Sequence, residues 1–361
     1  MGDDWRASAE TRRATWFVTR KYPPRIGGME TLSWELTRRI SKRRPTRVIA
    51  LRRSTLWLPL FLVHSALAIL GNGVRRKIGV LHLGDPVLAP LGCLAQRLGI
   101  PVCVTVHGLD VTFAKPLYKL WLRAFFRNLD AYICISAAAR TAAIARGAPA
   151  SRTNTVGIGV VSTEPTTVTR NSDLLLFIGR LVRRKGLEWF VHQVLPELAN
   201  RRPAIRLVII GAGPERAAIK RAATAAGVEH RIEWLGAVAD KDRSAWLRRA
   251  AICILPNVRV PNDIEGYGVV ALEAAAAGCP VVAADLEGLR DAIVDGEAGR
   301  LIASADREAW TNTIAELLGD PTRAAALGAR ARAWVRTERT WDAVCDGYEA
   351  VFDALASTRR M

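Results

Sequence analysis

Residues 174–186 read LLLFIGRLVRRKG, an apolar run of strand length that ends at a glycine and passes into a basic loop. A similar stretch, RLVIIGAGPER, follows at 206–216, after a segment of helical length. Continuous apolar strands that alternate with helices are typical of parallel sheets covered on both faces. The sequence therefore predicts an α/β fold whose ligands bind at the carboxyl ends of the strands.

Runs of this kind recur along the whole chain and form two groups. The first group of expected strands is Ala14–Thr19, Arg47–Leu51, Ile78–Leu83, Val102–His107 and Ala131–Ser136. The second is Leu174–Ile178, Arg206–Ile210, Ile232–Leu235, Ala251–Leu255, Val281–Ala284 and Gly299–Ile302. Because 361 residues exceed an ordinary single core, we expect two doubly wound domains, residues 1–168 and 169–361, joined through the polar linker Gly159–Ser172.

The charge is unevenly distributed between the two halves. The chain has 52 Lys and Arg against 34 Asp and Glu, and residues 1–170 carry a net charge of +17 while residues 171–361 carry +1. With half of the residues hydrophobic, a disordered or fibrous chain is excluded. Basicity alone gives only nonspecific affinity for nucleic acid, and no nucleic-acid-binding module is present, so no specific nucleic-acid partner is expected.

The six cysteines predict a reducing compartment. None of them forms a C-x-x-C pair, and they are expected to be reduced thiols that bind no metal. The N-terminus lacks the apolar segment of a secretory signal. The longest apolar run, Leu56–Leu70, contains Pro59 and His64 and is expected to be too short to span a bilayer. We expect a cytoplasmic protein.

Two features of the first half lie where a ligand would bind. Gly27 and Gly28 follow the first strand and open a helix, where glycines permit a close backbone approach and the helix N-terminus favours an anion. His107 ends the strand Val102–His107, at the edge of the sheet. A Gly-Gly turn and a lone histidine are also common structural features, and this alternative stays open.

A basic loop leaves the first strand of the second half. Arg180 and Lys185 lie in this loop, where two cations could neutralise a diphosphate. Arg183 and Arg184 are expected to face solvent. The alternative is a loop that is solvated throughout.

Two carboxylates frame a glycine-rich turn at 264–278, IEGYGVVALEAAAAG. Glu265 lies on the turn and Glu273 about two helical turns further on, so they should reach different parts of one ligand rather than one metal. Gly268 lets the helix N-terminus approach a phosphate closely. A carboxylate buried among Val, Leu and Ala costs free energy unless it is paired, which favours a functional role.

Together these segments resemble glycosyltransferase family 4, the retaining group 1 transferases of GT-B fold. The matching segments are GGME at 27–30, VHGLD at 106–110, ICIS at 133–136, GRLVRRKG at 179–186, GAGPE at 211–215 and EGYGVVALEAAAAGCPVV at 265–282. The resemblance implies two Rossmann-like domains across a cleft: residues 1–168 for the acceptor and 169–361 for the donor. It also implies that the last helix, about 340–356, packs back on the first domain. Residues 156–161, VGIGVV, depart from the Pro-Asn-Gly-Val-Asp stretch often found there.

The resemblance also implies the chemistry and its residues. The expected reaction is retaining transfer of a hexosyl group from a UDP- or GDP-linked sugar to an acceptor hydroxyl, without metal or other cofactor. The residues expected at the donor are Gly27, Gly28, Arg180, Lys185, Gly211, Gly268 and Glu273. Those expected at the reaction centre are His107, Glu265, Arg180 and Lys185. Glu265 would contact the transferred sugar and Glu273 the ribose hydroxyls.

Other functions fit parts of the sequence. Gly211-Ala212-Gly213, with Glu233 further on, could belong to a nicotinamide-dependent oxidoreductase, although Arg216 occupies the third glycine position. Within the same fold, a sugar epimerase or a phosphorylase is an alternative. Asp240-Lys241-Asp242 could bind a metal, but Asp240 is better explained as a helix N-cap.

The basic half predicts an anionic membrane as a partner. Residues Lys115, Lys119, Arg123 and Arg127 recur every four positions and would share one stripe of a helix. A second basic patch is expected at Arg38, Arg39, Lys42, Arg43 and Arg44. The acceptor would then be a lipid-linked or cell-envelope glycan, and the enzyme peripheral on the cytoplasmic face of the inner membrane. A soluble acceptor is the alternative.

Overall fold

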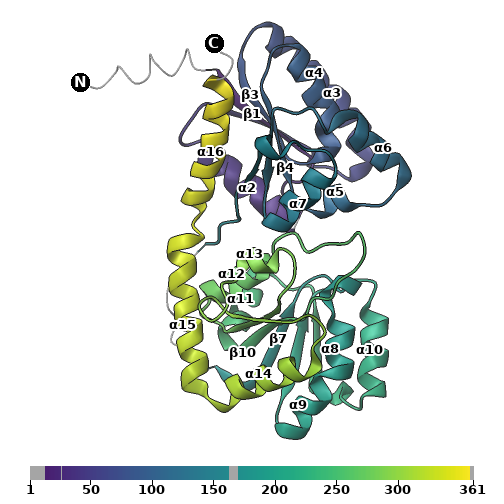
Figure 1. Cartoon of the computed structure of the whole chain (residues 1–361), viewed down its shortest axis with the longest axis vertical. Helices are drawn as coiled ribbons and strands as arrows, with labels where there is room; N and C mark the ends of the chain where they lie inside the picture. Colours follow the sequence, from purple (N-terminus) through teal and green to yellow (C-terminus); the bar gives the residue numbers. More distant parts are fainter. Residues whose placement is uncertain (1–12, 26, 162–169, 358–361) are drawn as a thin grey trace, which may run out of the picture. The chain divides into compact units, whose positions relative to one another are not determined.

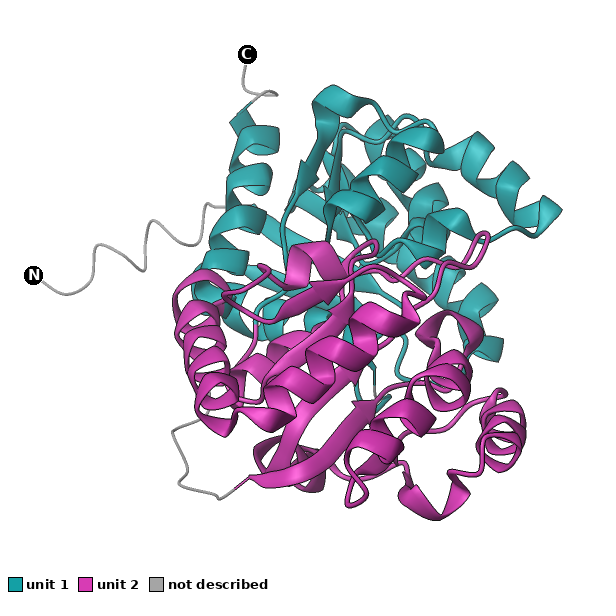
Figure 2. Ribbon diagram, turned by 60° about the horizontal axis from the view of Figure 1, so that its bottom comes forward, with its two compact units in different colours: residues 1–159, 341–361 teal, residues 160–340 magenta. Residues whose placement is uncertain are grey.

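The computed structural model describes residues 13–25, 27–161 and 170–357, which form two compact units. Unit 1 comprises residues 1–159 and 341–361, and unit 2 comprises residues 160–340 (Figure 2). The expected domain boundary between residues 168 and 169 lies outside the described residues. Each unit has its own sheet and its own buried core.

Unit 1 is built on a six-stranded sheet whose strands all run parallel. Its strands are β1 (Ala14–Thr19), β2 (Thr46–Ala50), β3 (Ile78–Leu83), β4 (Val102–Val106), β5 (Ala131–Cys134) and β6 (Thr153–Thr155). Their order is β2-β1-β3-β4-β5-β6. The direction of winding reverses between β1 and β3, and ligands of doubly wound sheets bind beyond the strand ends at such a point.

Unit 1 has helices on its sheet that fall into two packed groups. The helices of this unit are α2 (Gly28–Ile40), α3 (Leu58–Val74), α4 (Ala89–Arg97), α5 (Leu109–Thr112), α6 (Pro116–Phe125), α7 (Ala137–Ala145) and α16 (Trp341–Ser357). Helix α2 packs with α16, whereas α4 contacts both α3 and α6 (Figure 1). Because right-handed crossovers are the rule, the reversal at β1 puts these groups on opposite faces of the sheet.

The C-terminal helix α16 completes unit 1 although it comes last in the chain. Tyr348 and Phe352 are buried against the ring of His82 on β3, and Phe352 also contacts the ring of Phe17 on β1. Along another side, Arg43 and Arg44 bind α16 carboxylates. These ion pairs join Arg43 to Asp342, Asp346 and Glu349, and Arg44 to Asp353.

The basic patch expected at residues 38–44 is therefore largely paired within unit 1. Arg38 and Arg39 both bind the carboxylate of Glu35, at 2.8 and 3.1 Å. With Arg43 and Arg44 held by α16, most of this patch is occupied in the folded protein. Most of its cations therefore form ion pairs within unit 1.

Unit 2 contains a second parallel six-stranded sheet. Its strands are β7 (Asn171–Ile178), β8 (Arg206–Ile210), β9 (Ile232–Gly236), β10 (Ala250–Leu255), β11 (Val281–Ala284) and β12 (Arg300–Ile302). Their order is β12-β11-β10-β7-β8-β9. The winding reverses between β7 and β10, and this is the Rossmann strand order.

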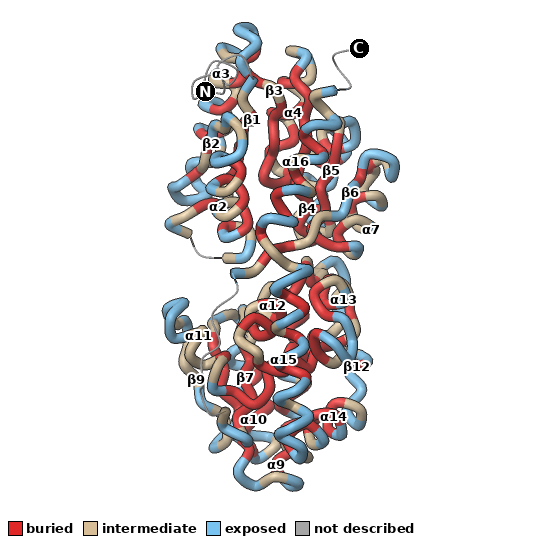
Figure 3. Tube along the Cα trace, turned by 90° about the vertical axis from the view of Figure 1, so that its left-hand side faces the viewer, coloured by how far each residue is buried: buried red, intermediate tan, exposed pale blue. Residues whose placement is uncertain are grey.

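Helices of unit 2 connect these strands and enclose them (Figure 3). They are α8 (Leu187–Gln193), α9 (Leu195–Arg201), α10 (Arg216–Ala225), α11 (Asp240–Arg249), α12 (Val269–Ala276), α13 (Leu289–Ala292), α14 (Arg307–Gly319) and α15 (Pro321–Glu338). The strands β7, β8, β10 and β11 are mostly buried, as continuous apolar runs require.

The predicted α/β class and parallel sheets are confirmed, with differences in detail. The short strand β6 (Thr153–Thr155) was missed, because three polar residues give no apolar run. All six cysteines are free, and Cys93 is the one that is only half-buried.

The apolar stretch around α3 is longer than the sequence suggested. Thr55–Val74 is 20 residues long with a mean hydropathy of 1.5, enough by length and composition to cross a membrane, and 22% of an 18-residue window within it is buried. The expectation that this stretch is too short for a span was therefore wrong on those two criteria.

Candidate active site

The centre of the candidate site in unit 2 is a buried ion pair at the carboxyl ends of β7 and β10. Nζ of Lys185, in the loop after β7, lies 2.5 Å from Oε2 of Glu265, in the segment after β10. Asn257, two residues beyond β10, donates its Nδ2–H to the same oxygen at 2.8 Å. All three side chains are buried. The pair lies where the winding of the sheet reverses, the position at which such sheets bind ligands.

The Glu265 carboxylate is held in its charged form. Burial would raise its pKa, but the charges of Lys185 and Arg184, together with the hydrogen bonds from Lys185 and Asn257, outweigh burial and lower the pKa. Its backbone N–H is also bound, by Oε2 of Glu287 at 2.5 Å. This places a fixed negative charge at the sheet edge.

Arg184 belongs to the same cluster, which corrects the expectation that it faces solvent. It is 7% exposed, and its guanidinium lies 3.6 Å from Glu265 and 3.4 Å from Asp263. The Arg184 carbonyl accepts the N–H of Val258, which joins this turn to the segment after β10. Arg183, by contrast, is exposed as expected.

Arg180 and Lys185 have different surroundings, although the same role was expected for both. Lys185 is committed to Glu265. Arg180 is exposed, and within the described ranges no carboxylate lies at ion-pair distance from it. The guanidinium of Arg180, like that of exposed Arg183 in the same loop, is therefore available to an incoming anion.

Gly211 has a structural function in the described state. Its φ is +139°, and a Cβ there would overlap the carbonyl oxygen of Gly179. The two loops are joined by hydrogen bonds from Leu181 N–H to Ala212 and from Glu215 N–H to Leu181. The glycine is thus required by the close approach of the loops after β7 and β8.

Glu273 lies on α12, whose N-cap Gly268 has a φ of +83°. Oε1 of Glu273 accepts a hydrogen bond from Arg243 of α11 at 3.0 Å. Burial raises the pKa of Glu273, and the charge of Arg243 opposes that rise. Its Oε2 is buried and has no hydrogen-bond partner in the described part of the chain. This oxygen can accept a hydrogen bond from a ligand hydroxyl.

In unit 1, His107 lies just beyond the end of β4. Its Nε2 is 3.0 Å from the carbonyl oxygen of Gly84, which only accepts, so Nε2 donates and Nδ1 is left as the acceptor. The Asp110 carboxylate accepts the backbone N–H of His107, at 2.9 and 3.1 Å. Burial raises the pKa of Asp110 to about 6, against the lowering effect of His107.

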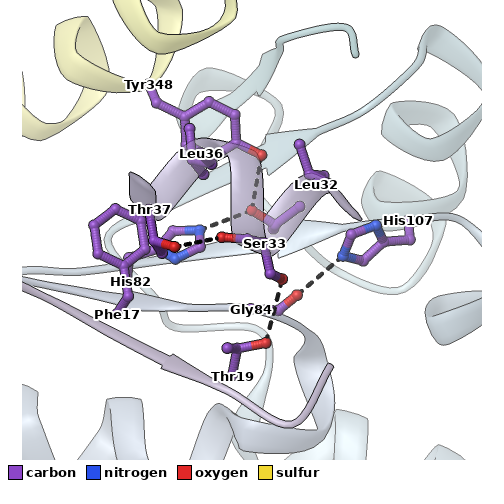
Figure 4. Close-up of a pocket in the computed structure, with 11 residues that line it drawn as sticks. Phe17, Thr19, Leu32, Ser33, Leu36, Thr37, His82, Gly84, His107 and Tyr348 are labelled. Carbon is purple, nitrogen blue, oxygen red and sulfur yellow. Dashed lines mark hydrogen bonds between the residues drawn. The ribbon is translucent and has the colours of Figure 1, made fainter. Parts of the chain in front are cut away.

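His107 also lines a small cavity where unit 1 reverses its winding (Figure 4). Its polar lining includes Thr19, Ser33 and His82. Its volume of about 10 Å³ is close to that of one water-sized sphere. His82 is neutral, because burial lowers its pKa to about 3, and its Nε2 lies 2.8 Å from the hydroxyl of Thr105.

Gly27 and Gly28 mark the N-terminus of α2 in unit 1. Gly27 is the N-cap, and a Cβ there would lie 2.5 Å from Oε2 of Glu30, a buried carboxylate. Gly28 is exposed. Oε1 of Glu30 lies 3.5 Å from Nζ of Lys21. A role for these glycines at the donor stays a prediction.

Sequence reasoning did not single out three side chains that contact Glu265 or Glu273: Asn257, Arg184 and Arg243. Asn257 could have been found, since it follows a fully apolar strand at the sheet edge by two residues.

The first aspartate of Asp240-Lys241-Asp242 is not an N-cap. Asp240 is the first residue of α11 and pairs with Arg243 at 3.3 Å. Among the described residues, no group of three or more His, Cys, Asp or Glu could hold a metal ion.

Comparison with known proteins identifies the family. Residues 172–320 match the Glycosyl transferases group 1, and residues 5–159 match the Glycosyl transferase 4-like domain. A GDP-mannose-dependent alpha-(1-6)-phosphatidylinositol monomannoside mannosyltransferase of Mycolicibacterium smegmatis is 30% identical over 270 residues, 70% of each chain. This chain belongs to the group 1 glycosyltransferases.

Further relatives of this glycosyltransferase span most of its length. The protein of the same name from Mycobacterium tuberculosis is 26% identical over 365 residues, 90% of this chain and 94% of the relative. Among solved structures, Anabaena HepE with UDP has a TM-score of 0.74 at 17% identity, covering 94% and 100% of the chains. A sucrose-phosphate synthase from Thermosynechococcus elongatus has a TM-score of 0.78 at 19% identity, covering 96% and 100%. These structures confirm the GT-B fold.

Proposed function

We propose that this glycosyltransferase moves mannose from GDP-mannose to a hydroxyl of a phosphatidylinositol-based lipid, with retention of anomeric configuration. The observation that carries the proposal is the similarity, over 90% of the chain, to a mannosyltransferase named for that donor and that acceptor. We place the enzyme at the cytoplasmic face of the inner membrane, because the donor is soluble and the acceptor is a lipid.

The proposal assigns separate tasks to the residues of unit 2. Arg180 binds the diphosphate, since its guanidinium is exposed and free of carboxylates among the described residues. Lys185 meets the same diphosphate from the buried side while it holds Glu265. Glu265 contacts the transferred sugar, and Glu273 uses its unpartnered Oε2 for a ribose hydroxyl. Gly211 and Gly268 keep the surrounding loops close to the phosphates.

The chemistry follows from where charge develops. As the glycosyl–phosphate bond breaks, the sugar becomes oxocarbenium-like and the diphosphate gains negative charge. Preorganised cations stabilise that charge without a reorganisation cost, so Arg180 and Lys185 can replace a metal ion. The fixed carboxylate of Glu265 can stabilise the positive sugar. His107 of unit 1, with Nδ1 free to accept, is proposed to line the reaction centre together with Gly27 and Gly28.

The activity is tested with membranes and purified enzyme. Labelled GDP-mannose and phosphatidylinositol or its monomannoside should give a mannosylated lipid, and UDP-glucose should give little product. Proton NMR of the first product should show the α anomer. Absence of transfer from GDP-mannose to any inositol lipid would reject the donor and acceptor together.

A substitution pair separates sugar contact from nucleotide contact. Glu265→Ala should abolish transfer and leave the affinity for GDP largely unchanged, because its carboxylate faces the sugar. Glu273→Ala should weaken GDP binding by ~1.5–3 kcal/mol, the worth of a charge-assisted hydrogen bond. Calorimetry on both variants decides the assignment, and equal losses of GDP affinity would contradict it.

A second candidate acceptor is a soluble inositol phosphate. A D-inositol 3-phosphate glycosyltransferase of Gordonia bronchialis is 31% identical over 196 residues, although these are 52% of this chain and 42% of the relative. Offering the enzyme inositol 3-phosphate and phosphatidylinositol in competition distinguishes the two acceptors.

A further inference from the structure

Helix α3 is packed on unit 1 along one face only. Its buried residues recur every four positions, at Phe61, Ser65, Ile69 and Gly73. Gly73 permits the closest approach, because a Cβ there would lie 2.9 Å from Leu98 and 3.0 Å from Ile100. This face packs against α4 and the residues that follow it.

The opposite face is a stripe of large apolar side chains exposed to solvent. We call it the α3 stripe, and it consists of Leu56 (89% exposed), Leu60 (59%), Val63 (56%), Leu67 (64%), Leu70 (37%) and Val74 (74%). At about 100° per residue, the five members within α3 fall in an arc of about 80°. Contiguous apolar patches of this kind on soluble proteins mark interaction sites.

Cations stand at both ends of the stripe. Arg52 and Arg53 precede it, Arg75, Arg76 and Lys77 follow it, and all five are exposed. Not one Asp or Glu occurs between Glu35 and Asp85, and none of the five has a carboxylate partner in the described ranges of the chain. Apolar side chains flanked by unpaired cations are complementary to a bilayer with anionic headgroups.

Helix α6 extends the same chemistry. Leu117 and Leu120 are 84% and 64% exposed, and Lys119 and Arg123 of the expected basic stripe are exposed on the same helix. Helix α4 contacts both α3 and α6, and the three helices lie together in unit 1 (Figure 1). Helix α6 therefore presents exposed apolar and basic side chains of the same kind as α3.

We propose that α3 lies flat in the interface of an anionic membrane, with the α3 stripe among the acyl chains and the flanking cations on the headgroups. A span is disfavoured because the Phe61–Gly73 face is already packed on unit 1. This proposal rests on the proposed lipid acceptor, since it explains how unit 1 reaches a substrate embedded in the bilayer. One alternative occupant is a second copy of the chain, because the stripe alternates spacings of four and three residues.

Vesicle co-sedimentation tests the proposal. Wild type should bind vesicles of phosphatidylcholine with about a third phosphatidylglycerol and bind pure phosphatidylcholine weakly. Leu60→Glu/Leu67→Glu should bind the anionic vesicles more than about tenfold more weakly, because two leucines no longer leave water. The matched control Val161→Glu/Val294→Glu, at apolar residues 57% and 42% exposed, should bind as wild type does.

Hydrogen exchange supplies a readout that needs no variant. Anionic vesicles should slow exchange across residues 55–77 of the wild type. Unchanged exchange there, or wild-type binding by Leu60→Glu/Leu67→Glu, would overturn the proposal. If sedimentation equilibrium shows that the wild type is a dimer and Leu60→Glu/Leu67→Glu is a monomer, the α3 stripe binds a second copy of the chain instead. GDP binding should be equal in the wild type and in all variants. If the wild type does not bind GDP at all, that result would reject the proposed function and not the membrane contact.

Discussion

Glu265 shows how one buried carboxylate depends on its neighbours. Glu265→Gln keeps the size of the side chain but leaves Lys185 and Arg184 without a counter-charge. We expect a loss of about 3 kcal/mol in the free energy of unfolding at pH 7, the range for breaking a buried pair.

The pH dependence of this loss has a defined sign. Because the folded pKa of Glu265 is lowered from 4.5, the carboxylate's contribution is fully present above the unfolded value and disappears as pH falls through the folded one. The stability difference between wild type and Glu265→Gln should therefore shrink below pH 4.5. Urea unfolding at pH 7, 4.5 and 3.5 measures it, with exposed Glu297→Gln as control. A difference independent of pH would contradict the prediction.

Asp110 should behave in the opposite way. Its pKa is raised from 3.8 to about 6, so the folded state binds the proton more tightly and wild-type stability falls as pH rises between these values. Asp110→Asn still accepts the His107 N–H but does not titrate. Relative to wild type, its melting temperature should rise between pH 4 and 6 and then level off. A melting-temperature difference that stays flat would mean that Asp110 titrates normally.

At the scale of elements, the loops after β7 and β8 depend on Gly211. Gly211→Ala must both adopt a φ of +139° and displace the Gly179 carbonyl. Gly227→Ala is the matched control, because its φ is +67° and nothing lies within 4 Å. The control should lose about 1 kcal/mol, the left-handed cost alone, and Gly211→Ala should lose roughly 1–3 kcal/mol more from overpacking. The affinity of Gly211→Ala for GDP should also fall. Similar losses of stability in both variants would show that the loops are free to separate.

The docking of α16 depends partly on Arg43. Arg43→Ala removes ion pairs to three carboxylates, which are mostly exposed, so the cost should be only about 1 kcal/mol. Lys42→Ala is the control, because Lys42 has no carboxylate partner among the described residues. The difference between the two melting temperatures should shrink in 0.5 M NaCl, since salt screens exposed pairs. A difference unaffected by salt would assign the effect to packing.

For the whole molecule, we predict transfer without a metal ion. In the proposed mechanism Arg180 and Lys185 neutralise the charge of the diphosphate, so we expect activity to survive excess EDTA. The measurement is the rate of mannosyl transfer with and without the chelator. Loss of activity that Mg²⁺ or Mn²⁺ restores would show that the two cations are insufficient.

The chain's hydrophobic pattern predicted most of the fold. Buried parallel strands must be apolar along their whole length, so runs such as Leu174–Ile178 and Arg206–Ile210 could be located without any tertiary information. Strand β6 (Thr153–Thr155) could not be located in this way, because it takes its place from pairing with β5.

The class of fold, the family and the loops of the candidate site could all be inferred from the residue pattern. The contacts that the side chains of those loops make could not, because they depend on how distant segments pack together. Lys185 and Glu265 are 80 residues apart in the chain, and local sequence cannot specify that contact. The inward turn of Arg184, the return of α16 to unit 1 and the exposure of the α3 stripe have the same origin. Periodicity shows that a helix has an apolar face, but what covers that face depends on elements distant in the sequence.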